Sequence, residues 1–313
     1  MLLTDYFRYP KDATWDIAKQ CGVEHGVIRL PETADFDLTD KTHWQQVYDG
    51  FRNYGITPVI IEPMPNEVHD HIKSGDALRD ASIEKVIKML PIMDALDIRC
   101  ICFNFMAHIG WLRTDNDIPE RGGAKVTGFD VKNFQHTGAA ITKEELWDNY
   151  TYFIKAVLPH CEQYGIRLAL HPDDPPRDLG AVERIMTSAD NIDHAINGIV
   201  KSDCLGITMC QATYHIMGED LFKVIPRFAD KTFFVHFRNT TGNLDNYRET
   251  YHDNGELDMA ALMKLYRKCG VDVPIRVDHV PTMPSERMVN QGYDALGRYF
   301  AIGYLKGILQ SVG

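Results

Sequence analysis

The sequence predicts an α/β protein built as one (β/α)8 TIM barrel over residues 1–313. Short apolar or alternating segments recur eight times along the chain, and longer amphipathic segments separate them. This alternation indicates parallel strands covered by helices, and eight such units in about 300 residues favour closure into a barrel. No interior linker, repeat or low-complexity tract divides the chain, so we expect a single domain.

The predicted strands are short and apolar, as strands buried on both faces of a parallel sheet should be. They cover residues 2–7, 26–30, 58–62, 98–105, 166–171, 206–210, 232–237 and 274–278. The predicted helices carry apolar residues at helical spacing, and several end on a glycine that can serve as a left-handed C-cap. They cover residues 15–22, 43–55, 83–97, 144–165, 220–231, 259–270 and 294–309.

Two long βα loops are expected, at about 106–142 and 238–257, because these stretches are irregular and directly follow predicted strands. In a barrel, such loops lie at the C-terminal face, where active sites are built. The sequence therefore predicts a functional site at this end of the barrel.

Charge and composition exclude several classes of partner. The 44 acidic and 33 basic residues give a net charge of −11, which argues against nucleic acid and an anionic membrane surface. The start of the chain lacks the apolar core of a signal peptide, and no stretch approaches 18 apolar residues, so we expect a cytoplasmic protein. The seven cysteines form neither a disulfide framework nor a paired zinc motif. A homo-oligomeric state remains open.

Four consecutive predicted strands end on or near a residue that can bind a divalent metal. These residues are His171, Cys210, His236 and Asp278. A lone histidine or cysteine on a strand is usually a core residue, but neighbouring barrel strands lie about 4.8 Å apart, so four such ends can surround one ion. Imidazole, thiolate and carboxylate together suit Mn²⁺, Fe²⁺, Co²⁺ or Zn²⁺.

Further polar residues lie around the same strand ends and are candidates for binding a substrate. They are Glu62, Asn104, Trp111, Arg113, Arg238, Asn239, Arg276 and His279. A guanidinium group can bind a carboxylate at two points, so Arg113 or Arg276 could hold an acid substrate beside the metal. Asp173 and Asp174 are either partners of this site or a helix N-cap, and the cap is the favoured interpretation.

Several stretches resemble the D-mannonate dehydratases of the xylose-isomerase-like barrels, and the similarity spans most of the chain. The stretches are residues 62–84, 101–115, 152–176, 234–239, 275–279 and 291–309, including the motif HPDDPP. The resemblance implies one ion of the Mn²⁺ type on His171, Cys210, His236 and Asp278. It also implies that Arg276, His279 and Tyr293 act on the substrate, and that D-mannonate loses water to give 2-keto-3-deoxy-D-gluconate.

The hypothesis is a metal-assisted β-elimination from a small anionic sugar acid. The ion and an arginine would grip the carboxylate, while Tyr293 and His279 would serve as acid and base in an order left open. One alternative is a sugar isomerase or epimerase on the same barrel, although most such sites use more carboxylates and no cysteine ligand. The other is a sugar-acid-binding barrel without catalysis.

Overall fold

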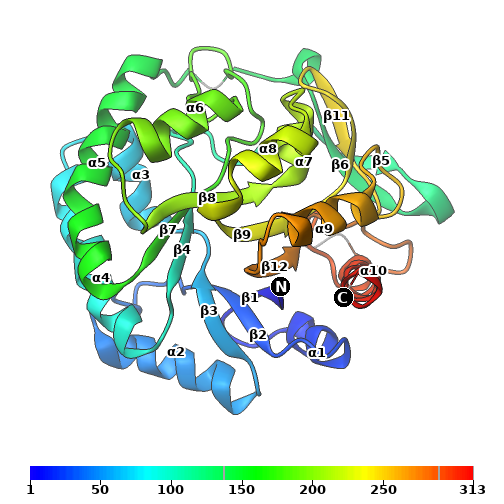
Figure 1. Cartoon of the computed structure of the whole chain (residues 1–313), viewed down its shortest axis with the longest axis horizontal. Coiled ribbons are helices and arrows are strands. Elements are labelled where there is room, and N and C mark those ends of the chain that lie inside the picture. The colour runs from blue at the N-terminus through cyan, green and yellow to red at the C-terminus, as the bar shows by residue number, and fades with distance from the viewer. Residues whose placement is uncertain (137, 288–289, 313) are drawn as a thin grey trace.

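Eight parallel strands close into a barrel in the computed structural model, which describes residues 1–136, 138–287 and 290–312 (Figure 1). Around the barrel the strands follow the order β1, β12, β9, β8, β7, β4, β3, β2. Their bounds are β1 Leu2–Arg8, β2 His25–Arg29, β3 Thr57–Ile61, β4 Cys100–Phe103, β7 Arg167–Leu170, β8 Leu205–Cys210, β9 Thr232–Phe237 and β12 Pro274–Val277. The predicted barrel and all eight of its predicted strands are confirmed.

Residues along each strand alternate between the inside of the barrel and the layer of helices outside it. Tyr6 and Val27 belong to a small apolar cluster inside the barrel, whereas Phe7 and Ile28 pack into the large core shared with the helices. Because the alternation has a period of two, the residue two positions after an interior residue also points inward, nearer the C-terminal end. This rule places the side chains that surround the barrel mouth.

Helices pack around the barrel, and seven of them match the predicted segments. These are α1 Ala13–Gln20, α2 Lys41–Asn53, α4 Arg79–Ala95, α5 Lys143–Tyr164, α8 Leu221–Arg227, α9 Met259–Lys268 and α10 Ala295–Ser311. In α5, the Thr142 side chain caps the helix through the backbone N–H of Glu145, whose carboxylate bonds back to Thr142. Gly165 ends this helix with φ +62°.

Three further helices were not predicted from the sequence. They are α3 Asn66–Ser74, α6 Ala189–Asp193 and α7 Gln211–Ile216. In α3, the buried residues Val68 and Ile72 have helical spacing. Pro63 and Pro65, directly before this helix, are typical of a loop and obscure the signal. α6 and α7 are too short to give a clear period.

The stretches at 106–142 and 238–257 also contain strands of their own. β5 Asp115–Pro119, β6 Lys125–Asp130, β10 Thr240–Asn243 and β11 Asn246–Glu249 form a four-stranded sheet in the order β10, β11, β6, β5. β6 and β11 pair in antiparallel fashion with Phe129 opposite Tyr247, and both rings are buried. This sheet therefore ties two distant connections together beyond the C-terminal ends of the barrel strands (Figure 1).

Within the described part of the chain, none of the helices combines the length and the apolar character needed to cross a bilayer. All seven cysteines are free thiols. The second observation agrees with the expectation that the chain carries no disulfide framework.

Candidate metal centre and active site

A cavity of about 990 Å³ lies at the C-terminal end of the barrel. Most of the residues predicted to act at the site line it, and they come from five different strand ends or the loops that follow them. They are Glu62, Asn104, Trp111, His171, His236, Arg276, Asp278, His279 and Tyr293. The cavity is the place where the predicted chemistry converges.

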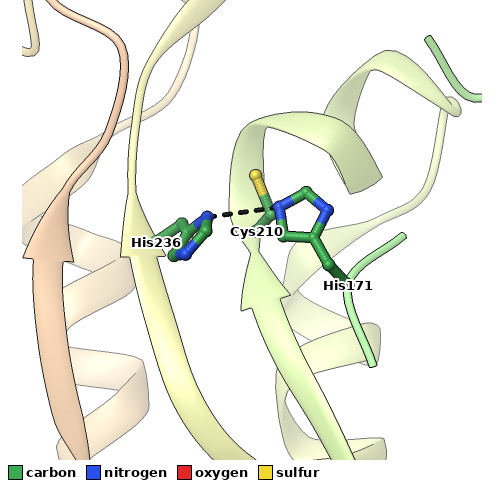
Figure 2. Close-up of side chains that lie close together, drawn as sticks. All are labelled: His171, Cys210 and His236. Atoms are coloured by element: carbon green, nitrogen blue, oxygen red, sulfur yellow. Dashed lines mark hydrogen bonds between the residues drawn. The ribbon is translucent and has the colours of Figure 1, made fainter. Parts of the chain in front are cut away.

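Three of the four predicted metal ligands form one compact group. One donor atom each of His171, Cys210 and His236 lies within 4.8 Å of the other two. Figure 2 shows the Cys210 sulfur near the two imidazoles, which approach each other from neighbouring parts of the barrel. All three residues occupy positions two after an interior residue, since Ala169, Thr208 and Phe234 lie on the inner surface.

The imidazoles of His171 and His236 face each other. Nδ1 of His171 donates to the Pro172 carbonyl at 2.6 Å, which leaves its Nε2 as an acceptor. This Nε2 lies 3.2 Å from Nδ1 of His236, and Nε2 of His236 lies 3.0 Å from Oε1 of Glu62. Two nitrogens bonded to one ion at ~2.1 Å lie roughly 3 Å apart, so the spacing of the two imidazoles fits a shared cation.

Asp278 completes the set from β12. Its Oδ2 is 3.6 Å from Nδ1 of His236, while its Oδ1 accepts hydrogen bonds from Arg276 at 2.9 Å and from Tyr293 at 3.1 Å. Burial, the largest influence, would raise the pKa of Asp278, but the neighbouring His279 and Arg276 side chains hold this pKa well below the ordinary value. The set therefore combines two imidazoles, one cysteine sulfur and one ionised carboxylate, which fits a divalent ion.

A second group of metal-type residues, Glu62, Cys102 and His236, lies deeper in the barrel. Glu62 already forms an ion pair with Arg276, whose Nε and Nη2 each donate to one carboxylate oxygen at 2.9 Å. Burial, the largest influence, and then the Glu62 charge raise the pKa of the Cys102 thiol well above its ordinary value. A protonated thiol and a carboxylate paired to arginine are poor metal ligands. The role of this group is instead to hold the His236 ring, which Glu62 contacts at 3.0 Å.

Three predicted substrate ligands do not line the cavity. Arg113 and Arg238 are fully buried and share two carboxylates. Each guanidinium contacts Asp174 at 2.7–2.8 Å and Glu249 at 2.6 Å. The third residue, Asn239, donates to the carbonyls of residues 252 and 257 and accepts from two backbone N–H groups. These side chains hold loops together, and their polar groups face protein partners instead of the cavity.

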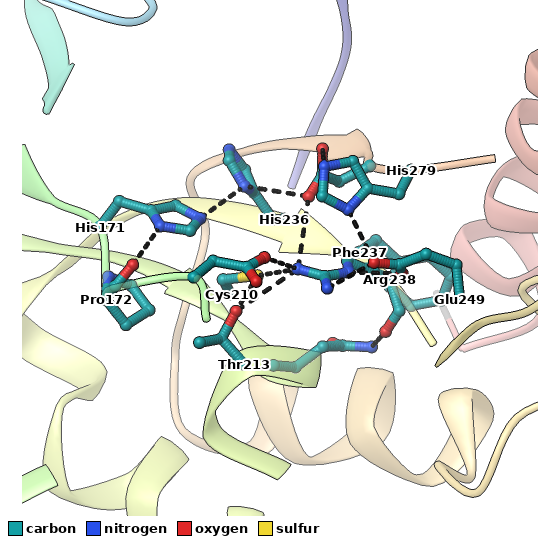
Figure 3. Close-up of polar contacts among 12 residues, drawn as sticks. His171, Pro172, Cys210, Thr213, His236, Phe237, Arg238, Glu249 and His279 are labelled. Carbon is teal, nitrogen blue, oxygen red and sulfur yellow. Dashed lines mark hydrogen bonds and ion pairs between the residues drawn. The ribbon is translucent and has the colours of Figure 1, made fainter. Parts of the chain in front are cut away.

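Arg238 also contacts Cys210, a candidate metal ligand. Its Nη1 lies 3.6 Å from the sulfur, and the Thr213 hydroxyl donates to the same sulfur at 3.1 Å. Figure 3 shows this chain of contacts from the sulfur through Arg238 to Glu249. A positive guanidinium and a hydroxyl donor stabilise a thiolate, the form in which cysteine binds metal.

The aspartates of the HPDDPP motif are not helix caps, so the favoured interpretation of them is wrong. The next helix, α6, is capped by Ser188. Asp173 instead accepts the backbone N–H groups of residues 185 and 186, and Asp174 pairs with Arg113 and Arg238. A local motif cannot show this, because the partners come from remote segments.

His279 and Tyr293 both line the cavity and pack edge to face, with ring centroids 5.3 Å apart. Nδ1 of His279 lies 3.1 Å from Oε1 of Glu249 and therefore carries the proton, which leaves Nε2 as a base. The backbone of His279 has φ +38°, a strained conformation that is concentrated at functional sites. Trp111 packs 5.0 Å from this imidazole, between centroids.

Two cationic residues of the cavity, Arg8 and Arg29, were missed in the sequence analysis. They end β1 and β2, two positions after the interior residues Tyr6 and Val27. The same alternation that marks the metal ligands could have found them. Arginine is not a metal-binding residue type, so a pattern of metal ligands at strand ends does not include these two positions.

A closed parallel barrel with candidate metal ligands at its C-terminal mouth defines the class of TIM-barrel enzymes with a metal-type site. The model of the D-mannonate dehydratase (UxuA) family matches residues 6–140 and 137–313. The chain belongs to the D-mannonate dehydratase family, a family of hydro-lyases. Membership confirms the resemblance seen in the sequence and favours the dehydratase over the isomerase and the non-catalytic binder.

Individual relatives agree with the family match. Mannonate dehydratase of Streptococcus agalactiae serotype III is 30% identical, and the alignment covers 90% of both chains. Mannonate dehydratase 2 of Halalkalibacterium halodurans is also 30% identical, over 84% of this chain and 85% of that one. The crystal structure of mannonate dehydratase from Streptococcus suis serotype 2 superimposes with a TM-score of 0.91 at 26% identity, covering 100% of this chain and 95% of the other. D-psicose 3-epimerase of Clostridium cellulolyticum H10, at 12% identity and a TM-score of 0.66, shares the fold alone.

Proposed function

We propose that the chain converts D-mannonate to 2-keto-3-deoxy-D-gluconate by metal-dependent β-elimination of water. The observation that carries this proposal is the cavity in which a base, an acid and a set of metal-type ligands meet within a family of D-mannonate dehydratases. The ligands would be His171, Cys210, His236 and Asp278, and their mixture of nitrogen, sulfur and oxygen donors favours Mn²⁺, with Fe²⁺, Co²⁺ and Zn²⁺ as alternatives. When bound, such an ion acts as a Lewis acid for the substrate carboxylate.

His279 is the proposed base. Its Nδ1–H is fixed by Glu249, so Nε2 is free to take the proton from C2 of the sugar acid. Burial raises the pKa of Glu249, but the charges of Arg238 and Arg113 and the hydrogen bond from His279 outweigh it and hold this pKa at about 2, so the carboxylate stays ionised. A permanent carboxylate behind the ring stabilises the imidazolium that forms when the proton arrives.

Tyr293 is the proposed acid for departure of the C3 hydroxyl. Burial and the neighbouring Asp278 raise the pKa of Tyr293 well above 10, although Arg276 acts in the opposite direction. The phenol is therefore protonated and already donates to a carboxylate oxygen at 3.1 Å. We assign it the role of donor, which makes His279 the base in this proposal.

Arg276 and Glu62 act as positioning residues in this proposal. Every guanidinium nitrogen of Arg276 has an acceptor in Glu62, Asp278 or the Val277 carbonyl, so it orients Asp278 and anchors Glu62 beneath His236. Asn104 and Trp111 line the cavity and remain proposed contacts of the substrate. The substrate is a small sugar acid that enters from the open mouth.

The test is to load the purified protein with Mn²⁺, supply D-mannonate and follow the 2-keto-3-deoxy acid. Cys210→Ser should lower metal affinity by more than about 100-fold and abolish turnover at limiting metal, because it removes a ligand. Cys269→Ser, a free thiol remote from the site, is the matched control and should behave as wild type. A metal-loaded wild type that leaves D-mannonate unchanged would overturn the proposal.

A further inference from the structure

The barrel mouth carries a pair of arginines opposite the candidate metal ligands. Arg8 and Arg29 are register partners at the ends of the neighbouring strands β1 and β2. In the closed barrel order, β1 lies across from β7 and β2 lies across from β8, the strands that lead to His171 and Cys210. Both arginines point into the same cavity as the metal-type residues.

These arginines are available to a ligand in a way that the buried arginines are not. Arg113, Arg238 and Arg276 are saturated by carboxylates of the protein. By contrast, the guanidinium of Arg8 has no hydrogen-bond or ion-pair partner among the described residues, while that of Arg29 contacts Glu32 at 2.7 Å and the Tyr6 hydroxyl. Arg8 therefore keeps its guanidinium donors for a ligand, and Arg29 keeps part of its own.

We propose that Arg8 and Arg29 form a second anion-binding subsite, and that the cavity binds six-carbon sugar acids with a carboxylate at both ends, the aldaric acids. The proposal rests on the proposed function, because one carboxylate of the ligand is taken to lie at the metal ligands. Eight strands ~4.8 Å apart give a barrel ~15 Å across between backbones, and side chains shorten this gap. An extended six-carbon diacid spans roughly 8 Å, so it can reach from one side to the other.

Guanidinium groups suit this role because each offers a planar fork of donors to a carboxylate. A terminal CH2OH group, as in D-mannonate, would use the same donors only as a neutral acceptor. The charge-assisted bond is the stronger one. Since Arg8 and Arg29 are partly exposed, solvent and salt weaken the gain without abolishing it.

The experiment compares D-mannonate with D-mannarate, which carries a carboxylate in place of the terminal CH2OH. Binding to the Mn²⁺-loaded protein is read by stopped-flow fluorescence of the tryptophans, since Trp111 lines the cavity and the binding phase precedes turnover. At low ionic strength, wild type should bind D-mannarate about tenfold more tightly than D-mannonate. The double variant Arg8→Gln/Arg29→Gln should bind the two acids equally.

Two further variants sharpen the test. Glu32→Gln frees Arg29 and should increase the preference for D-mannarate. Arg167→Gln removes the same charge at the opposite end of the barrel, where β7 begins, and should leave the preference unchanged. Equal binding of both acids by wild type, or a preference that survives in the folded double variant, would overturn the subsite. Turnover of D-mannonate is measured alongside; its absence would overturn the proposed function, whereas the comparison of affinities still decides the subsite.

Discussion

At the scale of single residues, the side chains of the barrel mouth follow from strand alternation. Each metal-type residue or cavity arginine sits two positions beyond an interior side chain, as His171 follows Ala169 and Arg8 follows Tyr6. The residue type and its place in the strand alternation are properties of the local sequence, so these positions could be predicted. The number of unpaired hydrogen-bond donors on a side chain could not be predicted, because it depends on partners remote in the sequence.

Tyr293→Phe should lower kcat by ~10²–10⁴-fold, because it removes the proposed acid while keeping the ring. The ring packs on Tyr6 with centroids 5.6 Å apart and on His279, so the variant should fold and hold its metal as wild type does. Steady-state kinetics with D-mannonate, together with metal analysis, provide the measurement. A kcat within threefold of wild type would rule out Tyr293 as the acid.

His69→Phe should stabilise the protein. His69 is fully buried beside three phenylalanine rings, and neither of its nitrogens has a hydrogen-bond partner among the described residues. Removing two unsatisfied polar atoms should raise the free energy of unfolding by ~1 kcal/mol at pH 8. Urea denaturation of both proteins provides the measurement.

The gain from this substitution should grow in acid. Burial, with a smaller effect of Lys73, lowers the pKa of His69 in the folded protein well below 6.5. The unfolded chain therefore binds a proton below pH 6.5 that the folded chain does not, and wild type loses up to ~1.4 kcal/mol of stability per pH unit there. The variant lacks this loss. A difference in stability between the two proteins that does not change with pH would contradict the account.

At the scale of elements, the barrel strands and the long helices were predicted correctly, whereas the sheet of β5, β6, β10 and β11 was not. A long helix carries its own period and caps within the sequence. The strands of the small sheet are only four to six residues long and are stabilised by pairing across the chain, as Phe129 opposite Tyr247 illustrates. A stretch of local sequence contains only one strand of the β6–β11 pair, so it does not reveal the pairing that stabilises both strands.

Thr142→Ala should destabilise the protein by ~1 kcal/mol, because the first turn of α5 loses its capping box. The cap is remote from the cavity lining, so kcat should not change. Thr151→Ala, in the middle of the same helix, is the control and should be neutral or slightly stabilising, since alanine has the higher helix propensity. Equal effects of the two substitutions on the urea midpoint would refute the capping role.

At the scale of the whole molecule, a buried network of charges holds the loops above the barrel. Arg113, Asp174, Arg238 and Glu249 come from the three connections that follow β4, β7 and β9, and each side chain is at most 2% exposed. Glu249 also fixes His279, and Arg238 also contacts Cys210. The network therefore links the small sheet, the proposed base and a proposed metal ligand into one unit (Figure 3).

Glu249→Gln should destabilise the protein by ~3–5 kcal/mol, because two buried guanidinium groups would be left with one carboxylate between them. The loss should be largest above about pH 4.5. As the pH falls from there toward the folded pKa of about 2, protonation of Glu249 removes the same ion pairs from wild type and the two proteins converge. Asp253→Asn, which breaks an exposed pair with Arg121, is the control and should cost under 1 kcal/mol. Similar losses for both variants would contradict the special role of the buried network.

The sequence by itself determined the barrel, its eight strands and the strand-end positions of His171, Cys210, His236 and Asp278, because apolar alternation and strand parity act over a few neighbouring residues. Only the tertiary structure decided which arginines pair with carboxylates of the protein and which face the cavity. Arg113 meets Asp174 and Glu249 across 61 and 136 residues, and Arg276 meets Glu62 across 214. A buried charge without a partner costs too much free energy, so each of these side chains must be paired. The partner is remote in the sequence and is brought close only by the folded chain.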